Sequence, residues 1–490
     1  MGFAWAYNGN YKESIKKYFE NKISLSLFGL LLLHFIWLIN TSNFQYAFND
    51  IRIKLPLFVI PFFVSAFDLK KQHLKNILFL FVFAVFAGAV VAFGRFLFAE
   101  QLNIKDIRLI SVFISHIRFS IMIAIATVII IYYWRDGDDL IQKNKLLSLG
   151  MLSFLILVLL VMKAISGIIL LLVGLVILFL LSNNKRNRAI SYSALGLISI
   201  FILYVAVLFY NVNMQYNKPI IQKNIELTTI RGNENYSGTT NDLQHENGNL
   251  INLNVCFIEL KQVWNNTSSI DFDKGLDKYQ EPIRFTLVRY LASKGYPLNQ
   301  DGALLLSKED IHNIEQGVTN YLFPNRFSAK YRIYTLLWEM NNLKFNKADL
   351  SGQSNAMRFV FFSTGYEIFK NYFWTGTGTG DVNDSFLWQY SFDQTQLSSE
   401  YRLRAHNQFL TFAISFGIIG FVFALITLLA PYFCNKTYPY LFGIIYTIIL
   451  LSFFNEDTLE TQAGISMFVF FIVLFSQNNP TQIKYYSKHN

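Results

Sequence analysis

A histidine with acid–base potential stands where a polar segment meets a long apolar one. His406 follows Arg402 and Arg404 and precedes an apolar run from Gln408 to Pro431. An imidazole in this position could take a proton from a hydroxyl group. Ionisable residues at the boundary of a membrane segment are functional candidates. A polar cap on a membrane helix is an equally good interpretation of the residues alone.

Arginines near these boundaries could bind an anion. Arg404 precedes His406, and Arg118 follows His116 at the start of another apolar run. A guanidinium group presents planar donors that match phosphate oxygens, so these side chains suit a phosphate or diphosphate beside a lipid surface. Each could instead extend to lipid headgroups without a specific ligand. His116 and Arg118 are two positions apart and do not share a helix face, and we favour Arg118.

Two carboxylates and a glycine-rich segment complete the polar features. Glu456 and Glu460 are four positions apart, so they could share one face of a helix over 456–462, although ordinary solvation at the interface explains them as well. The segment Gly376–Asp381 reads GTGTGD but lacks the Gly-Lys-Ser/Thr ending of a nucleotide-binding loop. We expect a tight turn or a hinge there, because glycine relieves backbone restrictions.

Membrane helices must hold these residues. Of the 490 residues, 53% are hydrophobic and 15% charged, whereas a soluble protein carries about 25% charge. The sequence predicts an all-α polytopic membrane protein with about 10 to 12 transmembrane helices. The predicted spans are 23–40, 54–67, 77–98, 117–134, 146–163, 165–182, 189–210, 407–431, 438–455 and 462–476. The second contains Pro56 and Pro61 and should be tilted or broken, and 104–115 could be re-entrant or interfacial.

Lysine and arginine predict the orientation of these spans. One set of loops holds Lys12, Lys16, Lys17, Lys22, Lys70, Lys71, Lys75, Arg135, Lys143, Lys145, Lys185, Arg186, Arg188, Lys436, Lys484 and Lys488. These loops should be cytoplasmic, together with both termini. We therefore expect an N-terminal membrane region over 1–210, a large, mainly helical periplasmic domain over 211–405, and a C-terminal membrane region over 406–490.

Composition disfavours other classes of protein. The net charge of +10 lies mostly in short loops, which is typical of membrane orientation and not of a nucleic-acid surface. The seven histidines are scattered, so we expect no metal site. Cys256 and Cys434 fall on opposite predicted sides, so no internal disulfide is expected. A transporter would place charges near the bilayer centre and often shows repeats; neither feature is visible.

The spacing around His406 resembles a known family signature. His406-Asn407, nine residues, and then Gly417-x-x-Gly420 is similar to the motif of the O-antigen ligase and O-antigen polymerase superfamily. The large preceding loop, the helix opened by Arg358, the Gly376–Asp381 turn and the acidic stretch 455–464 also resemble that family. So does the segment Ser115–Phe119.

The resemblance implies a function in the bacterial inner membrane. Members transfer a glycan from an undecaprenyl-diphosphate carrier to an acceptor hydroxyl such as that of the lipid A core, on the periplasmic face. The reaction would need no metal or cofactor and would invert the sugar linkage. An O-antigen polymerase and a protein O-oligosaccharyltransferase share the same module, and a lipid-linked sugar transporter is the less favoured alternative.

The resemblance also assigns roles to residues. His406 and Arg358 would be catalytic, with His406 as the base and the N-terminus of its helix favouring a neutral imidazole. The diphosphate would be bound by Arg118, Arg284, Arg289, Arg404 and Lys163. Supporting roles would fall to Asn407, Glu456, Glu460 and Asp381.

Overall fold

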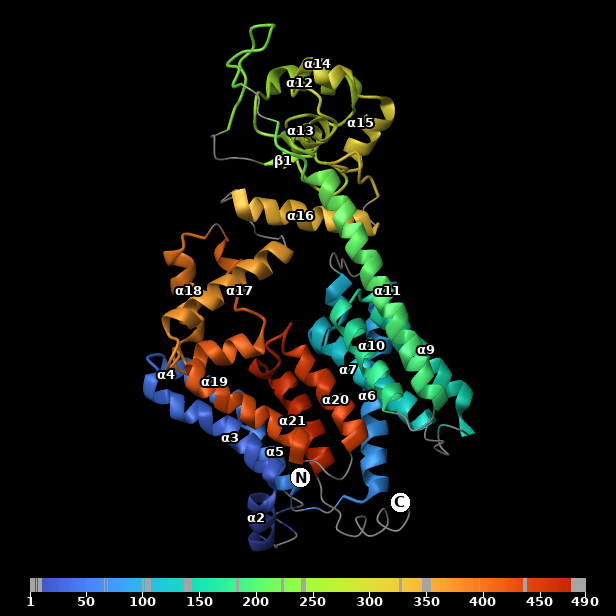
Figure 1. Ribbon diagram of the computed structural model, residues 1–490, viewed down its shortest axis with the longest axis vertical. Helices are drawn as coiled ribbons and strands as arrows, with labels where there is room; N and C mark the ends of the chain where they lie inside the picture. The colour runs from blue at the N-terminus through green and yellow to red at the C-terminus, as the bar shows by residue number, and fades with distance from the viewer. Residues whose placement is uncertain are drawn as a thin grey trace. The chain divides into compact units, whose positions relative to one another are not determined.

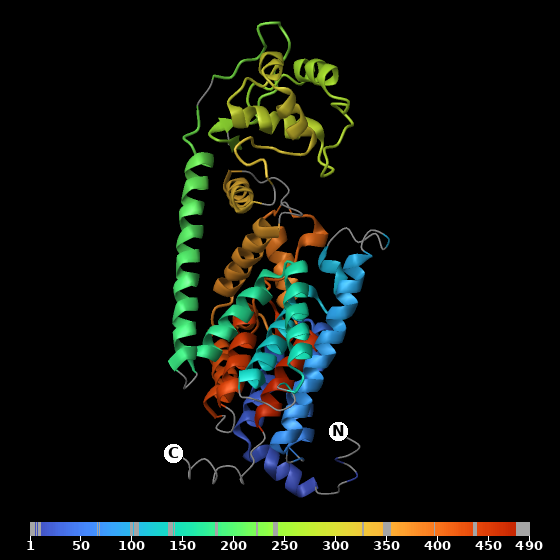
Figure 2. The same ribbon diagram turned by 90° about the vertical axis from the view of Figure 1, so that its right-hand side faces the viewer.

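The chain is mostly helical and divides into two compact units (Figures 1 and 2). The computed structural model describes residues 5, 7, 11–65, 67, 69–98, 101, 107–135, 141, 143–181, 185–221, 224–238, 244–325, 328–345, 354–395, 397–434 and 439–476. Unit 1 comprises Met1–Gly196, Phe361–Asp393 and Arg402–Asn490, and unit 2 comprises Leu197–Val360 and Gln394–Tyr401. The segment 361–393, which precedes His406 in the sequence, therefore belongs with the apolar helices of unit 1.

Apolar helices make up most of unit 1. Its helices are α2 (Tyr11–Glu20), α3 (Lys22–Ile36), α4 (Phe44–Lys54), α5 (Pro56–Val64), α6 (Lys71–Leu97), α7 (His116–Arg135), α9 (Lys145–Val161), α10 (Ile165–Leu180), α18 (Val382–Phe392), α19 (Gln408–Cys434), α20 (Pro439–Ser452) and α21 (Gln462–Ser476). Short 3-10 turns occur at η1 (Trp37–Asn40), η2 (Ile107–Ile110), η3 (Ser399–Tyr401) in unit 2 and η4 (Thr458–Glu460). Two further helices, α11 (Lys185–Tyr216) and α17 (Ser354–Asn371), contain residues of both units; α11 is the long green helix in Figure 2.

The membrane character of the chain is confirmed. Five described helices are long and apolar enough to cross a bilayer: Lys22–Asn40, Gln72–Leu97, His116–Arg135, Leu195–Tyr216 and Gln408–Cys434. Four shorter apolar helices, Lys145–Val161, Ile165–Leu180, Tyr440–Ser452 and Gln462–Ser476, match other predicted spans. The predicted second span is α5, nine residues with Pro61 inside. Within 104–115, residues 104–106 lie outside the described part, and Ile107–Ile110 forms the single turn η2.

Small residues let the central helices of unit 1 approach closely. On α10, a Cβ atom added at Gly167 would lie 2.6 Å from the Cβ of Ser120 on α7. One added at Gly174 would lie 2.7 Å from Ile448 on α20. Small residues at helix contacts are typical of membrane proteins, where association depends on close packing. This packing fixes α7 and α20, whose ends carry Arg118 and the acidic stretch that begins at Asn455.

Unit 2 has its own small core. It contains α12 (Phe257–Thr267), α13 (Ile283–Lys294), α14 (Gln300–Leu304), α15 (Lys308–Glu315) and α16 (Ala329–Phe345). A hairpin of β1 (His245–Glu246) and β2 (Asn249–Leu250) is antiparallel, with His245 opposite Leu250. It is an exception to the all-helical prediction. Buried apolar side chains, Trp264, Leu287 and Leu291 among them, form the core. The sequence Ser307-Lys-Glu-Asp310 predicts a capping box at the start of a helix. The structure confirms it at the start of α15, where Ser307 Oγ accepts a hydrogen bond from Asp310 N at 3.2 Å.

We predict that the part of unit 2 that follows α11 faces the outside of the membrane. Cys256 is fully buried, so an exposed thiol is needed as the probe; Ile230 is 99% exposed. In a Cys256→Ala background, Ile230→Cys should react with a membrane-impermeant maleimide in intact spheroplasts, because this part follows a loop predicted to be cytoplasmic and then the candidate span Leu195–Tyr216. The half-buried Cys434 should react only after the membrane is opened. Labelling of Cys434 alone from outside would mean that the orientation is reversed.

Candidate active site

Asn407, and not His406, caps helix α19. The Asn407 Oδ1 atom accepts a hydrogen bond from Leu410 N at 3.0 Å, and its Nδ2 atom donates to the Phe454 carbonyl at 3.2 Å. The side chain thus pairs a free N–H group of the first turn and joins α19 to the segment after α20. His406 lies one residue before the cap. The capping interpretation of His406 is therefore wrong, and its imidazole is available for another role.

The imidazole of His406 is half-buried, and it forms no structural hydrogen bond to a described residue. Its ring lies 5.9 Å from the ring of Phe361 on α17, centre to centre. Within the described ranges the ring takes part in no hydrogen bond that would hold it. A neutral imidazole has one nitrogen that can accept a proton, and nothing in this surrounding occupies that nitrogen.

The backbone at His406 has an uncommon conformation. Its φ angle is +50°, in the left-handed region, which costs a residue other than glycine about 1–3 kcal/mol. The hydrogen bonds of Asn407 and of Gln408, whose N–H donates to Phe453 O at 2.9 Å, hold the following residues in place and so maintain the strain. Lys163, in the exposed turn between α9 and α10, has a φ angle of +51°. Such strain clusters at functional sites, which motivates a test of His406.

A buried cluster of charges holds the start of α19. The Glu460 carboxylate accepts hydrogen bonds from Lys54 Nζ at 3.0 Å and from Gln408 Nε2 at 2.9 Å. Arg404 Nη1 lies 3.5 Å from the same carboxylate, and Lys54 also pairs with Asp50 at 2.5 Å. The Lys54 side chain is 1% exposed. We call Asp50, Lys54, Arg404 and Glu460 the Glu460 cluster; it joins α4, η4 and the residues beside His406.

The cluster is ionised because its charges balance. Burial alone would raise the pKa of Glu460, but Lys54 and Arg404 lower the pKa more, and it lies below its usual range. Burial would lower the pKa of Arg404, yet Glu460 and Asp457 raise it above its usual value. Burial raises the pKa of Asp50 to about 6, with Lys54 acting in the opposite direction. At neutral pH Arg404 is therefore a paired cation and not a free one.

A second ion pair lies beside the first. Arg118 Nη2 donates to the Glu456 carboxylate at 2.5 Å, and the two side chains are 14% and 8% exposed. Asn455 Nδ2 donates to Ser166 Oγ at 2.6 Å, and Thr411 Oγ1 donates to Asp457 at 2.9 Å. The acidic stretch after α20 therefore joins α7, α10 and α19.

The predicted helix over 456–462 is wrong. Thr458–Glu460 forms only the 3-10 turn η4, and α21 begins at Gln462. Glu456 and Glu460 bind different arginines, Arg118 and Arg404. The Nε atoms of both arginines are buried and have no hydrogen-bond partner among the described residues. Each guanidinium group thus keeps one donor for which the fold provides no acceptor.

The glycine-rich segment is a tight turn that fills a break in α19. Gly417 is not helical, with φ +61° and ψ −172°. The backbone groups that the break leaves unpaired bind the turn: Thr377 N donates to Ile414 O at 2.8 Å, Gly378 N to Ser415 O at 3.0 Å, and Ile418 N to Phe373 O at 2.7 Å. The turn interpretation of the glycine-rich segment is confirmed, and the segment is packed on both sides.

The other side of this turn contacts the end of α3, which lies beside α19 in Figure 1. Trp37 Nε1 donates to Thr375 O at 2.6 Å, and Asn40 Nδ2 donates to Gly376 O at 2.6 Å. Asp381 then accepts hydrogen bonds from the backbone N–H groups of Ser42 and Asn43 at 2.6 and 2.7 Å. Asp381 therefore fixes the start of α4 and lines a cavity of about 880 Å³.

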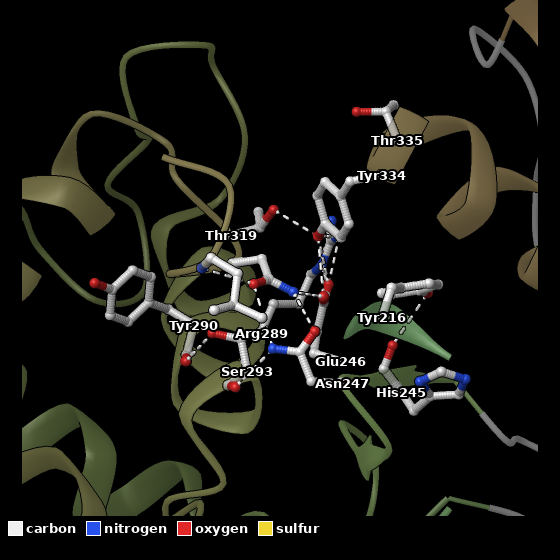
Figure 3. Close-up of polar contacts among 12 residues, drawn as sticks. Tyr216, His245, Glu246, Asn247, Arg289, Tyr290, Ser293, Thr319, Tyr334 and Thr335 are labelled. Carbon is white, nitrogen blue, oxygen red and sulfur yellow. Dashed lines mark hydrogen bonds and ion pairs between the residues drawn. The ribbon is translucent and has the colours of Figure 1, made fainter. Parts of the chain in front are cut away.

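The remaining candidate residues lie in unit 2. Arg289 binds the fully buried Glu246 through Nε and Nη2 at 2.8 and 2.7 Å (Figure 3). Its guanidinium lies 4.0 Å from the centre of the Trp338 ring. Arg284 is exposed beside Phe285, and Arg358 is exposed on α17. The candidates that lie in the His406 region of unit 1 are Arg118, Arg404, Asn407, Glu456 and Glu460.

Sequence reasoning missed Lys54, Asp50 and Gln408. A signal for the first two was present, since Asp50 and Lys54 are four positions apart just before an apolar stretch, where a helical ion pair is expected. No group of three or more His, Cys, Asp or Glu side chains is arranged to hold a metal ion in the described part of the chain.

Removal of the Glu460 carboxylate should destabilise unit 1. In Glu460→Ala, Lys54 and Arg404 would remain buried without their shared partner, which costs about 3–5 kcal/mol. We expect a clearly lower melting temperature for the purified protein in detergent. Glu367→Ala is the control, because Glu367 pairs with Lys370 at 3.6 Å on the surface and should matter little. Equal melting temperatures for the two variants would contradict a structural role of the cluster.

A comparison with protein families gives a match. A family model described as O-antigen ligase matches residues 318–425. The matched stretch includes α17, the glycine-rich turn, His406, Asn407 and both glycines of the Gly417-x-x-Gly420 motif. A comparison with curated proteins finds no match. The chain is thus a membrane protein whose segment 318–425 is similar to the O-antigen ligase family, which supports its membership of that superfamily.

Proposed function

We propose that this protein is an O-antigen ligase-type glycosyltransferase of the bacterial inner membrane. It transfers a glycan from an undecaprenyl-diphosphate carrier to a hydroxyl group of the lipid A core on the periplasmic face. The observation that carries the proposal is the imidazole of His406, which has no hydrogen bond to a described residue and lies just before the Asn407 cap of α19, inside the segment that matches the family. The predicted loop orientation and the apolar helices support the membrane setting.

His406 acts as the general base of this reaction. The acceptor hydroxyl oxygen attacks the anomeric carbon of the donor sugar, and its proton passes to the neutral imidazole. The bond between that carbon and the diphosphate oxygen breaks in the same step, so the linkage is inverted. The strained backbone of His406 directs the ring, and the Asn407 contacts maintain that direction.

Arginines stabilise the leaving diphosphate. It is a weak base and needs neutralised charge more than an acid. Arg118 and Arg404 each present a buried Nε–H group that has no acceptor among the described residues, and Arg358 is an exposed cation of the matched segment. Lys163, Arg284 and Arg289 are further candidates from the sequence. The ion pair of Arg289 with Glu246 favours a structural role for that residue.

Deletion of the gene tests the type of transfer. Loss of all polymer from the lipid A core indicates a ligase, whereas a core that carries a single repeat unit indicates a polymerase. Unchanged glycolipid together with an unmodified secreted protein indicates a protein O-oligosaccharyltransferase. The His406 module is common to all three, so the surface glycans must be separated on a gel to distinguish them.

His406→Ala should lower transfer by about 10²–10⁴-fold, the usual effect of removing a general base. The measurement is transfer from lipid-linked donor in membranes with matched amounts of protein. His312→Ala removes an exposed histidine of α15 and should leave transfer unchanged. Transfer by His406→Ala at the wild-type rate would contradict the assignment of the base.

Arg358→Lys should reduce transfer almost as much as Arg358→Ala. Lysine keeps the positive charge but loses the planar pair of donors that can bind two phosphate oxygens at once. Arg332→Lys, at an exposed position of α16, is the matched control. Full activity of Arg358→Lys would show that the residue contributes only positive potential or packing.

A further inference from the structure

A polar cavity of unit 1 lies beside the glycine-rich turn. Its volume is about 880 Å³, and its walls come from the loop before α4, from α17, from the turn and from α18. Asn43, Asp381, Asp384 and Gln389 provide polar atoms, and Tyr372 and Trp388 provide aromatic rings. Sites for small organic ligands have volumes of this order and combine apolar walls with a few fixed polar groups.

One polar atom of this wall has no partner in the fold. Gln389 is 4% exposed, and its Nε2 atom donates to Asp393 at 2.8 Å. Its Oε1 atom is buried and accepts no hydrogen bond from the residues that the structure describes. A buried acceptor without a donor costs free energy, because the group has lost its hydrogen bonds to water. A ligand that donates a hydrogen bond to Gln389 would remove that cost.

The charge of the wall excludes the diphosphate as its ligand. None of the described residues that line the cavity is Lys, Arg or His, and two of them are the carboxylates Asp381 and Asp384. Asp381 is occupied by the N–H groups of Ser42 and Asn43. Asp384 accepts one bond through Oδ2 from Asn43 at 2.8 Å. Its exposed carboxylate can accept further hydrogen bonds, since a carboxylate offers about four lone-pair positions.

Acceptor oxygens beside exposed aromatic rings suit a ligand that is rich in hydroxyl groups. Sugar hydroxyls donate to carboxylate and amide oxygens, and the C–H faces of a pyranose ring pack on Tyr and Trp rings. Trp388 is 58% exposed and Tyr372 is 47% exposed. The neighbouring turn is hydrogen-bonded to α3 and α19, so its wall, which includes Thr375 and Thr377, is fixed in advance.

We propose that this cavity is a subsite for a sugar unit of the glycan substrate, bound by Gln389 and Asp384 and separate from the region that binds the diphosphate. The proposal rests on the proposed glycosyltransferase function. Two sources have the same chemistry: the repeat-unit glycan of the donor and the core oligosaccharide of the acceptor. Neither needs its lipid or its diphosphate to occupy a cavity of this kind.

The test uses the full-length protein in detergent and two soluble probes. One is the repeat-unit oligosaccharide released from the lipid-linked donor by mild acid, and the other is the core oligosaccharide released from lipid A. Binding is measured by calorimetry for the wild type, Gln389→Met and Asp384→Asn. Gln262→Met, at an exposed position of α12, is the matched control. Asp384 is itself exposed, so Asp384→Asn remains informative if Gln389→Met folds poorly.

We expect one probe to bind the wild type and the control equally and both cavity variants about 10-fold more weakly, as loss of one hydrogen bond predicts. Binding of the repeat unit assigns the cavity to the donor, and binding of the core assigns it to the acceptor. Absence of binding for both probes, or equal affinity in all four proteins, would overturn the proposal. His406→Ala should bind the probe like the wild type, so wild-type transfer by that variant would disprove the proposed base while leaving the subsite intact.

Discussion

The backbone pairing between the broken helix α19 and the glycine-rich turn organises unit 1. A helix in a membrane cannot leave peptide groups unpaired, because no water is present to bind them. The break at Gly417 is therefore possible only because Phe373, Thr377 and Gly378 provide the missing partners. The first half of α19 begins directly after His406 and Asn407, and the turn also forms a wall of the polar cavity. One set of hydrogen bonds thus positions both the candidate base and the candidate sugar subsite.

Paired charges give the start of α19 its second support. Glu460 and Glu456 each bind a different arginine, and Lys54 connects Glu460 to α4. Buried ion pairs add little net stability but become costly when one partner is removed. These ion pairs instead fix the positions of several helices around the acidic stretch. The same pairs leave the Nε–H groups of Arg118 and Arg404 without acceptors among the described residues. A bound anion could accept hydrogen bonds from these groups.

Much of the fold followed from the sequence, because apolar runs and capping residues act locally. The apolar helices, the turn at Gly376–Gly380 and the capping box at Ser307 were all predicted from neighbouring residues. Contacts between distant segments were not. Lys54 and Glu460 have no sequence relation that pairs them, and Gly417 lies in an apolar run that looks like one continuous helix. Arg289 shows the same limit, since a local pattern cannot distinguish an arginine that binds a ligand from one that neutralises a buried Glu246.

The glycine contacts also constrain how this protein can evolve. A side chain at Gly376 would meet backbone atoms of Ser415, Phe416 and Gly417 within 2.5 Å, and one at Gly417 would meet the Trp374 carbonyl at 2.4 Å. Both positions have left-handed backbone as well. Since the obstacles are main-chain atoms, no change of a neighbouring side chain could make room. Substitutions at these glycines should therefore lack second-site suppressors nearby. The residues that surround Gly376 and Gly417 can change during evolution, but these two glycines cannot.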